Sequence, residues 1–341
     1  MKRKSVTMKD IAEKLNLSVN AVSIVLNNKD GVGEETRKLV LDTAEKLGYI
    51  DQSTKYLQAY SNKNICVLLK DRYFRDFRFY GRILLGIEEK AKKSGYDVFI
   101  TSYEKAEVPS CIECRKVSGI IVVGKIEDAF LNRIKKYKIP VVLVDYISFE
   151  ESTDSVISDN RLGAYKMTAY LIGKGKKKIG YFGDIEYTPS TRDRFLGFQD
   201  AVQQYMNFNT FKESMAYVEQ FSALENVEEY VIKQDAKGIY EAFEKIPTKP
   251  EVLICSNDEL AIFLMRTLQE KGYSIPKDIG IAGFDDIELS RMITPALTTV
   301  HVQKKLMGEK AMQRLLYRMG HRNDDVEKII MDVEIVERDS V

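Results

Sequence analysis

The sequence predicts an α/β protein with an N-terminal helix-turn-helix headpiece of three helices, followed by a core of two doubly wound α/β subdomains. Two observations lead to this prediction. Residues 7–28 have the pattern of two short helices joined by a tight turn, and a third helical pattern covers 34–47. From Ile65 onward, short apolar runs alternate with amphipathic segments, which is typical of parallel sheets covered on both faces.

Capping residues mark the start of the first two helices. Thr7 is placed to cap the first helix, with Asp10 in the reciprocal position of a capping box, and Ser18 is placed to cap the second. Two helices separated by a three-residue turn match the helix-turn-helix, whose second helix enters the major groove of DNA. A helical hairpin that only supports its own core has the same spacing, so the spacing alone leaves both interpretations open.

The third helix is followed by a polar segment. Gly48 stands where a left-handed helix cap is expected. Residues 51–64 contain too few apolar side chains to form a core, so we interpret them as a linker that becomes helical when it meets a partner. A plain tether is the alternative interpretation.

Seven apolar runs predict the strands of the core. They cover 65–69, 96–100, 119–124, 141–145, 178–183, 252–256 and 279–284. Seven strands over this length fit two lobes better than one, with a ligand bound in the crevice at the carboxyl ends of the strands. The connection 103–117 is short and contains a proline, so we expect a curtailed crossover helix there.

The charge and the apolar runs limit the class of protein. The formal net charge is +1 over 341 residues, whereas residues 1–63 carry eleven Lys or Arg against eight Asp or Glu. This modest basic end suits a local contact with phosphate better than a general affinity for polyanions. Because no apolar segment follows the basic start and no apolar run approaches the length of a bilayer, we expect a cytoplasmic protein with no membrane partner.

Motifs of catalysis are missing from the sequence. It contains no G-x-G-x-x-G after the first strand, no G-x-x-x-x-G-K-[ST], no G-x-S-x-G and no H-E-x-x-H. We therefore predict no enzyme and no cofactor. Cys111 and Cys114 form a C-x-x-C, a pattern of redox sites and of half zinc sites. We predict no metal site, because His301 and His321 are the only histidines and lie far away in the sequence.

Polar residues follow several of the predicted strands. Asp145, Asn257, Asp258 and Asp285 lie at strand ends, and Arg194 opens the run R-F-L-G-F. Carboxylates, an amide and a guanidinium converging on one crevice can bind a polar ligand through paired hydrogen bonds. The alternative for each is a helix N-cap, which fits Asp258 best.

These motifs together resemble the LacI/GalR family of bacterial transcription regulators, over nearly the whole chain. The headpiece resemblance rests on TMKDIAEKLNLSVNAVSIVLNN (7–28) and GVGEETRKLVLDTAEKLGY (31–49). Further matches, in the family's order, are GIE (86–88), IPVVLVD (139–145), DNxxG (159–163), RxxGF (194–198), PEVLICSND (250–258), DIGIAGFDDI (278–287) and PALTTV (295–300). The resemblance implies a periplasmic-binding-protein-like core that senses a small-molecule effector, and a homodimer that reads a near-palindromic double-stranded DNA operator.

The division of the chain follows from the same resemblance. The headpiece is expected at 1–50, the hinge at 51–64 and the effector-binding and dimerisation core at 65–341. Within the core, we expect an N-subdomain of about 65–162 and 297–325 and a C-subdomain of about 163–296 and 326–341.

The resemblance also implies roles for single residues. The DNA-binding set is Thr7, Ser18, Val19, Asn20, Ala21, Ser23, Ile24, Asn27, Thr36, Arg37 and Leu57. Within it, Val19, Asn20 and Ile24 occupy base-reading positions. Leu57 matches the hinge leucine that wedges into the minor groove, and a wedge of that kind kinks the duplex. The effector-binding set is Tyr80, Asp145, Tyr146, Arg194, Asn257, Asp258 and Asp285.

Three departures from the family pattern shape the expected specificity. Ile24 stands where many members carry an arginine, so we expect apolar contact with a thymine methyl in place of a guanine contact. Tyr146 replaces a frequent arginine, and RDFRFYG (75–81) is bulkier and more basic than usual, which together predict an aromatic pocket that tolerates anions. The run EIVERDSV (334–341) ends where simple dimeric members of the family end, and no C-terminal leucine heptads follow it, so we expect a dimer and not a tetramer.

The sequence therefore predicts a sequence-specific transcription regulator, a repressor, whose operator affinity is controlled by a sugar or a related polar metabolite. A solute-binding protein without DNA-binding function is the alternative.

Overall fold

The structure is a computed structural model and describes residues 6–26, 31–50, 63–75, 77–103 and 107–341. Its longer helices are α1 (Met8–Leu15), α2 (Val19–Leu26), α3 (Glu34–Lys46), α6 (Phe77–Lys93), α8 (Asp128–Lys135), α9 (Asn160–Gly173), α10 (Pro189–Tyr205), α11 (Phe211–Phe221), α13 (Ala236–Glu244), α14 (Asp258–Glu270) and α15 (Lys304–Gly320). Short helices are α5 (Asp71–Arg75), α7 (Ser110–Glu113), α12 (Val227–Ile232) and the 3-10 turn η1 (Glu288–Arg291).

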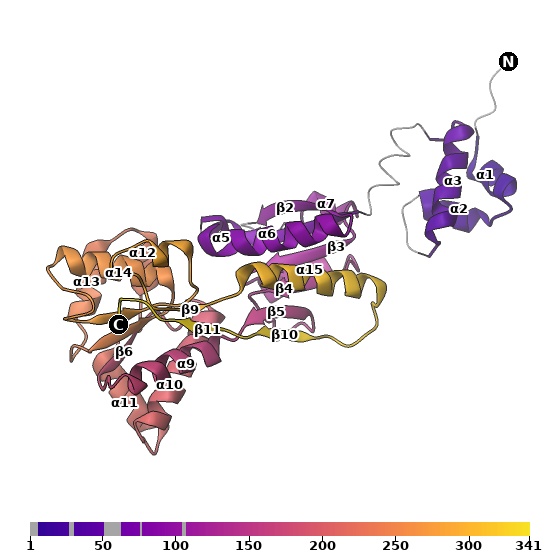
Figure 1. The fold of residues 1–341 in the computed structure, drawn as a ribbon. Helices are drawn as coiled ribbons and strands as arrows, with labels where there is room; N and C mark the ends of the chain where they lie inside the picture. Colours follow the sequence, from indigo (N-terminus) through magenta and orange to yellow (C-terminus); the bar gives the residue numbers. More distant parts are fainter. Residues whose placement is uncertain (1–5, 27–30, 51–62, 76, 104–106) are drawn as a thin grey trace.

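The headpiece has a small apolar core of its own. Ile11 on α1, Val22 and Val25 on α2, and Val40 and Ala44 on α3 are buried together. These residues recur three or four positions apart on each helix, so one face of every helix is apolar and the three faces meet. The three-helix headpiece predicted from the sequence is confirmed (Figure 1).

The first lobe of the core is built on a six-stranded parallel sheet. Its strands, in spatial order, are β10 (Lys328–Met331), β5 (Asp154–Ser158), β4 (Val141–Val144), β3 (Gly119–Val123), β1 (Asn64–Lys70) and β2 (Asp97–Tyr103). Val67 and Leu69 on β1 face α6 and α15, whereas Cys66 and Leu68 face α7 and α8. The two faces are both apolar because both are covered by helices.

The second lobe contains a three-stranded parallel sheet in the order β6 (Ile179–Phe182), β7 (Val252–Cys255) and β8 (Gly280–Ala282). A two-stranded antiparallel pair, β9 (Thr299–His301) and β11 (Glu334–Val336), lies where the chain passes between the lobes. All seven predicted strands are present, and the crossover predicted to be curtailed is the four-residue helix α7.

Close contact between α6 and α15 fixes the first lobe (Figure 1). A Cβ at Gly86 would lie 2.0 Å from the carbonyl oxygen of Lys305, and one at Gly308 would lie 2.1 Å from that of Ile83. Only glycine permits the two backbones to approach so closely. The other end of α15 is held by Asp154 on β5, whose carboxylate accepts hydrogen bonds from the guanidinium groups of Arg314 and Arg318.

The strand pairing places one segment in a different lobe from the one predicted. Lys328–Met331 pairs with β5 in the six-stranded sheet, although the prediction places 326–341 in the second lobe. The chain therefore leaves the first lobe after Met331 and not before residue 326. The reason is that β10 is an edge strand with half of its side chains exposed, and its apolar run, Ile329–Met331, is only three residues long.

Candidate DNA-binding surface and effector cavity

The caps of the headpiece helices form as the sequence predicts. Thr7 and Asp10 make a capping box, in which the backbone N–H of Asp10 donates to Thr7 Oγ1 at 3.4 Å and that of Thr7 donates to Asp10 Oδ2 at 2.7 Å. Asn16 ends α1 in the left-handed region at φ 53°. Ser18 then caps α2, because its Oγ accepts a hydrogen bond from the backbone N–H of Ala21 at 3.0 Å. This geometry fixes the turn between the two helices.

The second helix presents one face to its own core and another to solvent. Val22 and Val25 are fully buried, whereas Val19 is 47 % exposed and Asn20 is exposed beside it. Ile24 is half-buried. The side chains proposed to read bases thus lie on the face of α2 that the headpiece core does not use. Ser18 is also exposed, and Ala21 and Ser23 are half-buried.

The remaining members of the predicted DNA-binding set differ in how far they are exposed to solvent. Thr36 is half-buried in the first turn of α3. Arg37 is only 7 % exposed, and its predicted DNA contact stays a prediction. Asn27 and Leu57 lie outside the described residues, and their predicted contacts stay predictions.

A cavity of about 490 Å³ opens between the two lobes of the core. Its walls come from the residues that follow β1, the start of α6, the start of α10, α12, the start of α14 and the loop after β8. The lining residues named in the sequence analysis are Tyr80, Arg194, Asn257 and Asp285. Because the carboxyl ends of parallel strands meet at one edge of a sheet, residues far apart in the sequence converge here.

Arg194 is the polar centre of this cavity. Its guanidinium donates to Asn160 Oδ1 at 2.8 Å, to the carbonyl oxygen of Ser256 at 2.7 Å and to Asp285 Oδ1 at 2.9 Å, and it stacks on the ring of Phe284. Burial raises the pKa of Asp285, and the Arg194 guanidinium counteracts that rise. Three fixed acceptors and one aromatic face hold Arg194 in a single orientation.

Asp145 lies behind Tyr80 at the end of β4. Its backbone is left-handed at φ 59°, and its Oδ2 accepts a hydrogen bond from the hydroxyl of Tyr80 at 3.0 Å. Burial raises the pKa of this carboxyl to about 6. Asp145 therefore reaches the cavity through Tyr80, and it can exchange a proton near neutral pH.

Two predicted effector contacts lie elsewhere. Tyr146 follows Asp145 by one residue, points to the opposite face of the sheet and is buried in the apolar cluster with Cys66 and Phe130. Asp258 is fully buried, and its carboxylate accepts hydrogen bonds from protein groups only: the Ile287 N–H and the hydroxyls of Ser290 and Thr299. Neither residue lines the cavity.

The helix cap at the start of α14 also differs by one position from the sequence interpretation. Asn257, and not Asp258, is the N-cap, and its Oδ1 accepts a hydrogen bond from the Leu260 N–H at 2.9 Å. Asn257 keeps its amide group at the cavity wall, where Nδ2 donates to Ser256 Oγ at 3.4 Å.

Several cavity residues were missed by the sequence analysis. Arg72, Tyr73, Tyr187, Glu228 and Glu259 all line the cavity. Arg72 and Tyr73 follow directly after β1, so the rule that ligands bind at strand ends would have found them. Glu228 had no signal, because it lies on the short helix α12. Burial raises its pKa to about 7, and its carboxylate accepts hydrogen bonds from the Ser256 hydroxyl and the Asp184 N–H, both at 2.6 Å.

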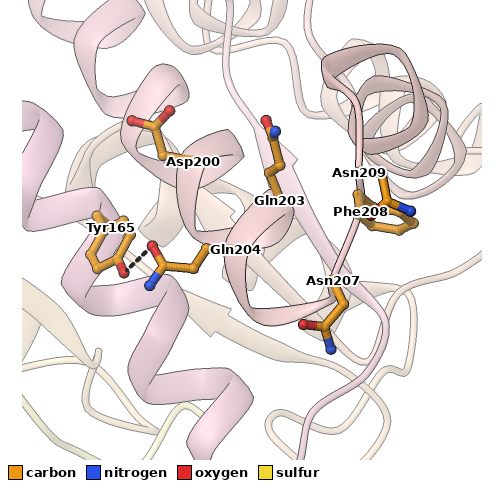
Figure 2. A pocket seen from close by; sticks show the side chains of 7 residues that line it. All are labelled: Tyr165, Asp200, Gln203, Gln204, Asn207, Phe208 and Asn209. Carbon is orange, nitrogen blue, oxygen red and sulfur yellow. Dashed lines mark hydrogen bonds between the residues drawn. The ribbon is translucent and has the colours of Figure 1, made fainter.

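A second, open hollow of about 670 Å³ lies on the second lobe and shares no residue with this cavity (Figure 2). It is lined mainly by the amide side chains of Gln203, Gln204, Asn207 and Asn209. The hydroxyl of Tyr165 donates to Gln204 Oε1 at 2.9 Å. Amide groups of this kind are well solvated, and the hollow gives no sign of a charged ligand.

Comparison with known proteins places these features in a family. Residues 7–52 match the family described as bacterial regulatory proteins, lacI family, and residues 168–341, just over half of the chain, match the periplasmic binding protein-like domain. The chain belongs to the LacI family of bacterial regulatory proteins. Its headpiece is the family's helix-turn-helix, and its core is the family's periplasmic-binding-protein-like effector domain.

Whole-chain relatives agree with this assignment. The HTH-type transcriptional repressor PurR of Mannheimia succiniciproducens is 26 % identical over 348 residues, with 98 % of each chain covered. As a LacI-family member with this full-length likeness, the chain is a DNA-binding transcriptional repressor with an effector-binding core. No helix within the described ranges is long and apolar enough to cross a bilayer.

Solved structures share the fold of this LacI-family chain. The transcriptional regulator CelR in its cellobiose complex superposes with a TM-score of 0.67 at 19 % identity, covering 98 % of this chain and 100 % of that one. The lac repressor dimer bound to operator and the anti-inducer ONPF superposes with a TM-score of 0.66 at 22 % identity, covering 99 % of both chains.

Proposed function

We propose that this LacI-family repressor binds a near-palindromic operator as a homodimer, and that a polyhydroxylated small molecule with an anionic group controls its operator affinity. The effector would bind in the cavity between the lobes and change the angle between them. Ligand control of this kind requires that the effector bind one lobe arrangement more tightly than the other.

The charge distribution of the cavity supports an anionic group on the effector. Arg194 is paired with Asp285, and Arg78 lies 3.5 Å from Glu259. Arg72, by contrast, donates to the neutral hydroxyl of Tyr73 at 2.7 Å, so its positive charge is not used in that contact. A carboxylate or phosphate is the natural partner of such a guanidinium. This observation carries the proposal.

The rest of the lining supports a sugar-like body. Tyr73, Phe79, Tyr80 and Tyr187 supply aromatic surfaces, and the amide of Asn257 supplies both a donor and an acceptor. Ligand pockets commonly combine aromatic walls with a few placed polar groups. The cellobiose held by the structurally similar regulator CelR also favours a carbohydrate.

Calorimetry with the full-length chain tests the effector class. Uronic and aldonic acids would be titrated beside the neutral sugars of the same stereochemistry. We expect an acid to bind, and Arg72→Gln to weaken that acid by about tenfold or more because one charge-assisted contact is lost. Arg266→Gln, an exposed arginine on α14 outside the cavity, is the matched control. Equal binding of acid and neutral sugar, unaffected by Arg72→Gln, would rule out the anionic group.

An exposed apolar groove supports the homodimer. Phe77 and Leu85 on α6 and Ile100 on β2 are 65 %, 39 % and 48 % exposed, and they line a groove of about 1210 Å³ that continues to His301 and Arg338 beyond the first lobe. Exposed apolar side chains that are grouped in one groove are a common feature of protein interfaces. A second copy of the chain would bury it and place two headpieces side by side.

Sedimentation and selection experiments test the dimer and its operator. Phe77→Asp should yield a monomer at micromolar concentration, whereas Phe149→Asp, at a side chain that is 92 % exposed outside the groove, should leave the dimer unchanged. Selection from random duplex DNA with the full-length chain should enrich a near-palindrome. A monomeric wild-type chain, or enrichment of single half-sites only, would contradict the proposal.

A further inference from the structure

Two cysteines meet at one face of the six-stranded sheet, away from the residues that line the effector cavity, and a third follows on the same short helix. Cys66 lies on β1 and is fully buried, Cys111 is half-buried on α7, and Cys114 is exposed at the end of the same helix. The Sγ atoms of Cys66 and Cys111 are 3.7 Å apart. The C-x-x-C of the sequence thus has a third thiol beside it, contributed by a strand 45 residues earlier.

A metal site does not account for this arrangement. Within the ranges that the structure describes, no group of three or more His, Cys, Asp or Glu side chains is placed to hold a metal ion. A structural zinc ion needs four ligands. Two thiols in contact can instead be oxidised to a disulfide.

The two neighbouring thiols differ in acidity. The sulfur–sulfur hydrogen bond between Cys111 and Cys66 lowers the pKa of Cys111 to about 7, with a smaller contribution from nearby backbone N–H groups. The same hydrogen bond, together with burial, raises the pKa of Cys66. Cys111 is therefore the more acidic thiol of the pair, and Cys66 keeps its proton to higher pH. The thiolate is the nucleophile of cysteine chemistry, and Cys111 is also the one of the two that solvent reaches.

We propose that Cys111 and Cys66 form a peroxide-sensitive disulfide that lowers the operator affinity of this repressor. In the first step the Cys111 thiolate attacks one oxygen of hydrogen peroxide, the O–O bond breaks, and the products are a sulfenic acid and, after protonation, water. In the second step the Cys66 sulfur attacks the sulfenic sulfur, its proton leaves with the hydroxyl as water, and the S–S bond forms. Two thiols are oxidised by two electrons and one peroxide is reduced to two waters.

The bond is within reach of the folded structure. A disulfide needs the sulfurs about 2.05 Å apart, so the present separation must shrink by less than about 2 Å. The one-turn helix α7 carries Cys111, and it is the shortest helix over this face of the sheet. A short helix with few buried side chains can shift by this amount more easily than the central strand β1.

Hydrogen bonds connect Cys111 to the point where the core meets the hinge. The carbonyl oxygen of Cys111 accepts from the Lys116 N–H at 2.8 Å, and the Lys116 carbonyl accepts from Asn64 Nδ2 at 3.1 Å. The Ser118 N–H in turn donates to the carbonyl oxygen of Asn64 at 2.8 Å. Asn64 is the first residue of β1, directly after the segment that joins the core to the headpiece. Movement of α7 toward β1 is therefore transmitted to Asn64 through these hydrogen bonds.

Peptide mapping tests the chemistry. The reduced full-length chain would be treated with one to ten equivalents of hydrogen peroxide, quenched with acid, alkylated and digested with trypsin and a glutamate-specific protease. Cleavage after Glu113 separates Cys111 from Cys114, so the two possible partners are distinguished. We expect peptide 64–70 linked to peptide 108–113, with Cys114 alkylated. A Cys111–Cys114 link, or sulfinic acid at Cys111 beside an alkylatable Cys66, would overturn the proposal.

Operator binding tests the regulatory consequence. A duplex obtained by selection with the reduced chain would be titrated with reduced, oxidised and re-reduced protein. We expect oxidation to weaken binding by about tenfold and dithiothreitol to restore it. Cys111→Ser and Cys66→Ala should bind as the reduced wild type and ignore peroxide, and Cys255→Ala, at a buried thiol on β7, should respond as wild type does. Equal operator affinity of the disulfide-linked and reduced forms would refute the proposed regulation. It would leave the repressor function intact, because operator binding by the reduced chain is the reference.

Discussion

Arg194 offers the sharpest test of how the effector cavity is held together. Replacing it by methionine keeps much of the side-chain volume and removes the guanidinium that bonds Asn160, Ser256 and Asp285. The Asp285 carboxylate would then be buried without its cationic partner. Breaking a buried ion pair from one side costs about 3–5 kcal/mol of unfolding free energy, because the remaining charge is uncompensated.

Urea unfolding followed by circular dichroism, on the full-length chain at pH 7, measures this loss. Arg161→Met is the matched control, since Arg161 makes an exposed pair with Asp200 at 2.6 Å and such pairs contribute at most about 1 kcal/mol. The double variant Arg194→Met with Asp285→Asn should recover part of the loss, because the stranded charge is gone.

The pH dependence of the Arg194→Met variant gives a second readout. Burial already raises the pKa of Asp285, and loss of the guanidinium raises it further. An acid whose folded-state pKa exceeds its unfolded value contributes stability at low pH and loses it as the pH rises through the folded pKa. The variant should therefore approach wild-type stability on acidification. A single variant within about 1 kcal/mol of wild type at pH 7 would refute the view that this ion pair is buried and necessary.

Three further predictions use other parts of the chain. Burial raises the Glu228 pKa from 4.5 to about 7, which stabilises the folded state by about 3 kcal/mol only while the carboxyl is protonated. We therefore expect wild type to lose stability between pH 5 and 8, and Glu228→Gln to reduce that loss. An unchanged pH dependence in thermal unfolding would contradict this. Ile24→Arg should shift one selected operator position from thymine to guanine by about 1–3 kcal/mol of discrimination, and an unchanged consensus would show that Ile24 reads no base. Gly308→Ala should lower the unfolding free energy by about 1–3 kcal/mol because the methyl meets a backbone carbonyl, whereas Gly173→Ala, with open space around it, should be neutral or slightly stabilising in the same urea assay.

The strands that the sequence revealed are those whose side chains are buried on both faces. A run such as 119–123 is apolar at every position, so its pattern is visible without knowledge of its neighbours. Strand β5 was missed because Asp154, at its first position, is buried against Arg314 and Arg318, which lie 160 and 164 residues away. In a sequence, a charged residue indicates an exposed loop, and only its buried partners show that it belongs to a strand.

For the effector cavity, too, the sequence reveals only some of the residues. Arg194, Asn257 and Asp285 could be predicted because each lies at a strand end or in a family motif, and the fold brings those ends together. Tyr146 follows a strand-end residue by one position, and sequence patterns do not say where a strand's alternation stops. Asp258 follows a strand equally well, but its carboxylate meets the hydroxyl of Thr299, 41 residues later. Only the three-dimensional structure distinguishes a carboxylate that awaits a ligand from one already satisfied.

The three places where the chain passes between the lobes determine what kind of motion the core can make. They lie between β5 and α9, between β9 and α15, and between β10 and β11. Two of them touch, since the Asp159 N–H donates to the Met331 carbonyl oxygen at 2.9 Å. Connections that cross side by side favour a bend at the crossing over a sliding of one lobe past the other. We therefore expect the lobes to open and close about these crossings, so that a small molecule that contacts both lobes favours one of the two arrangements.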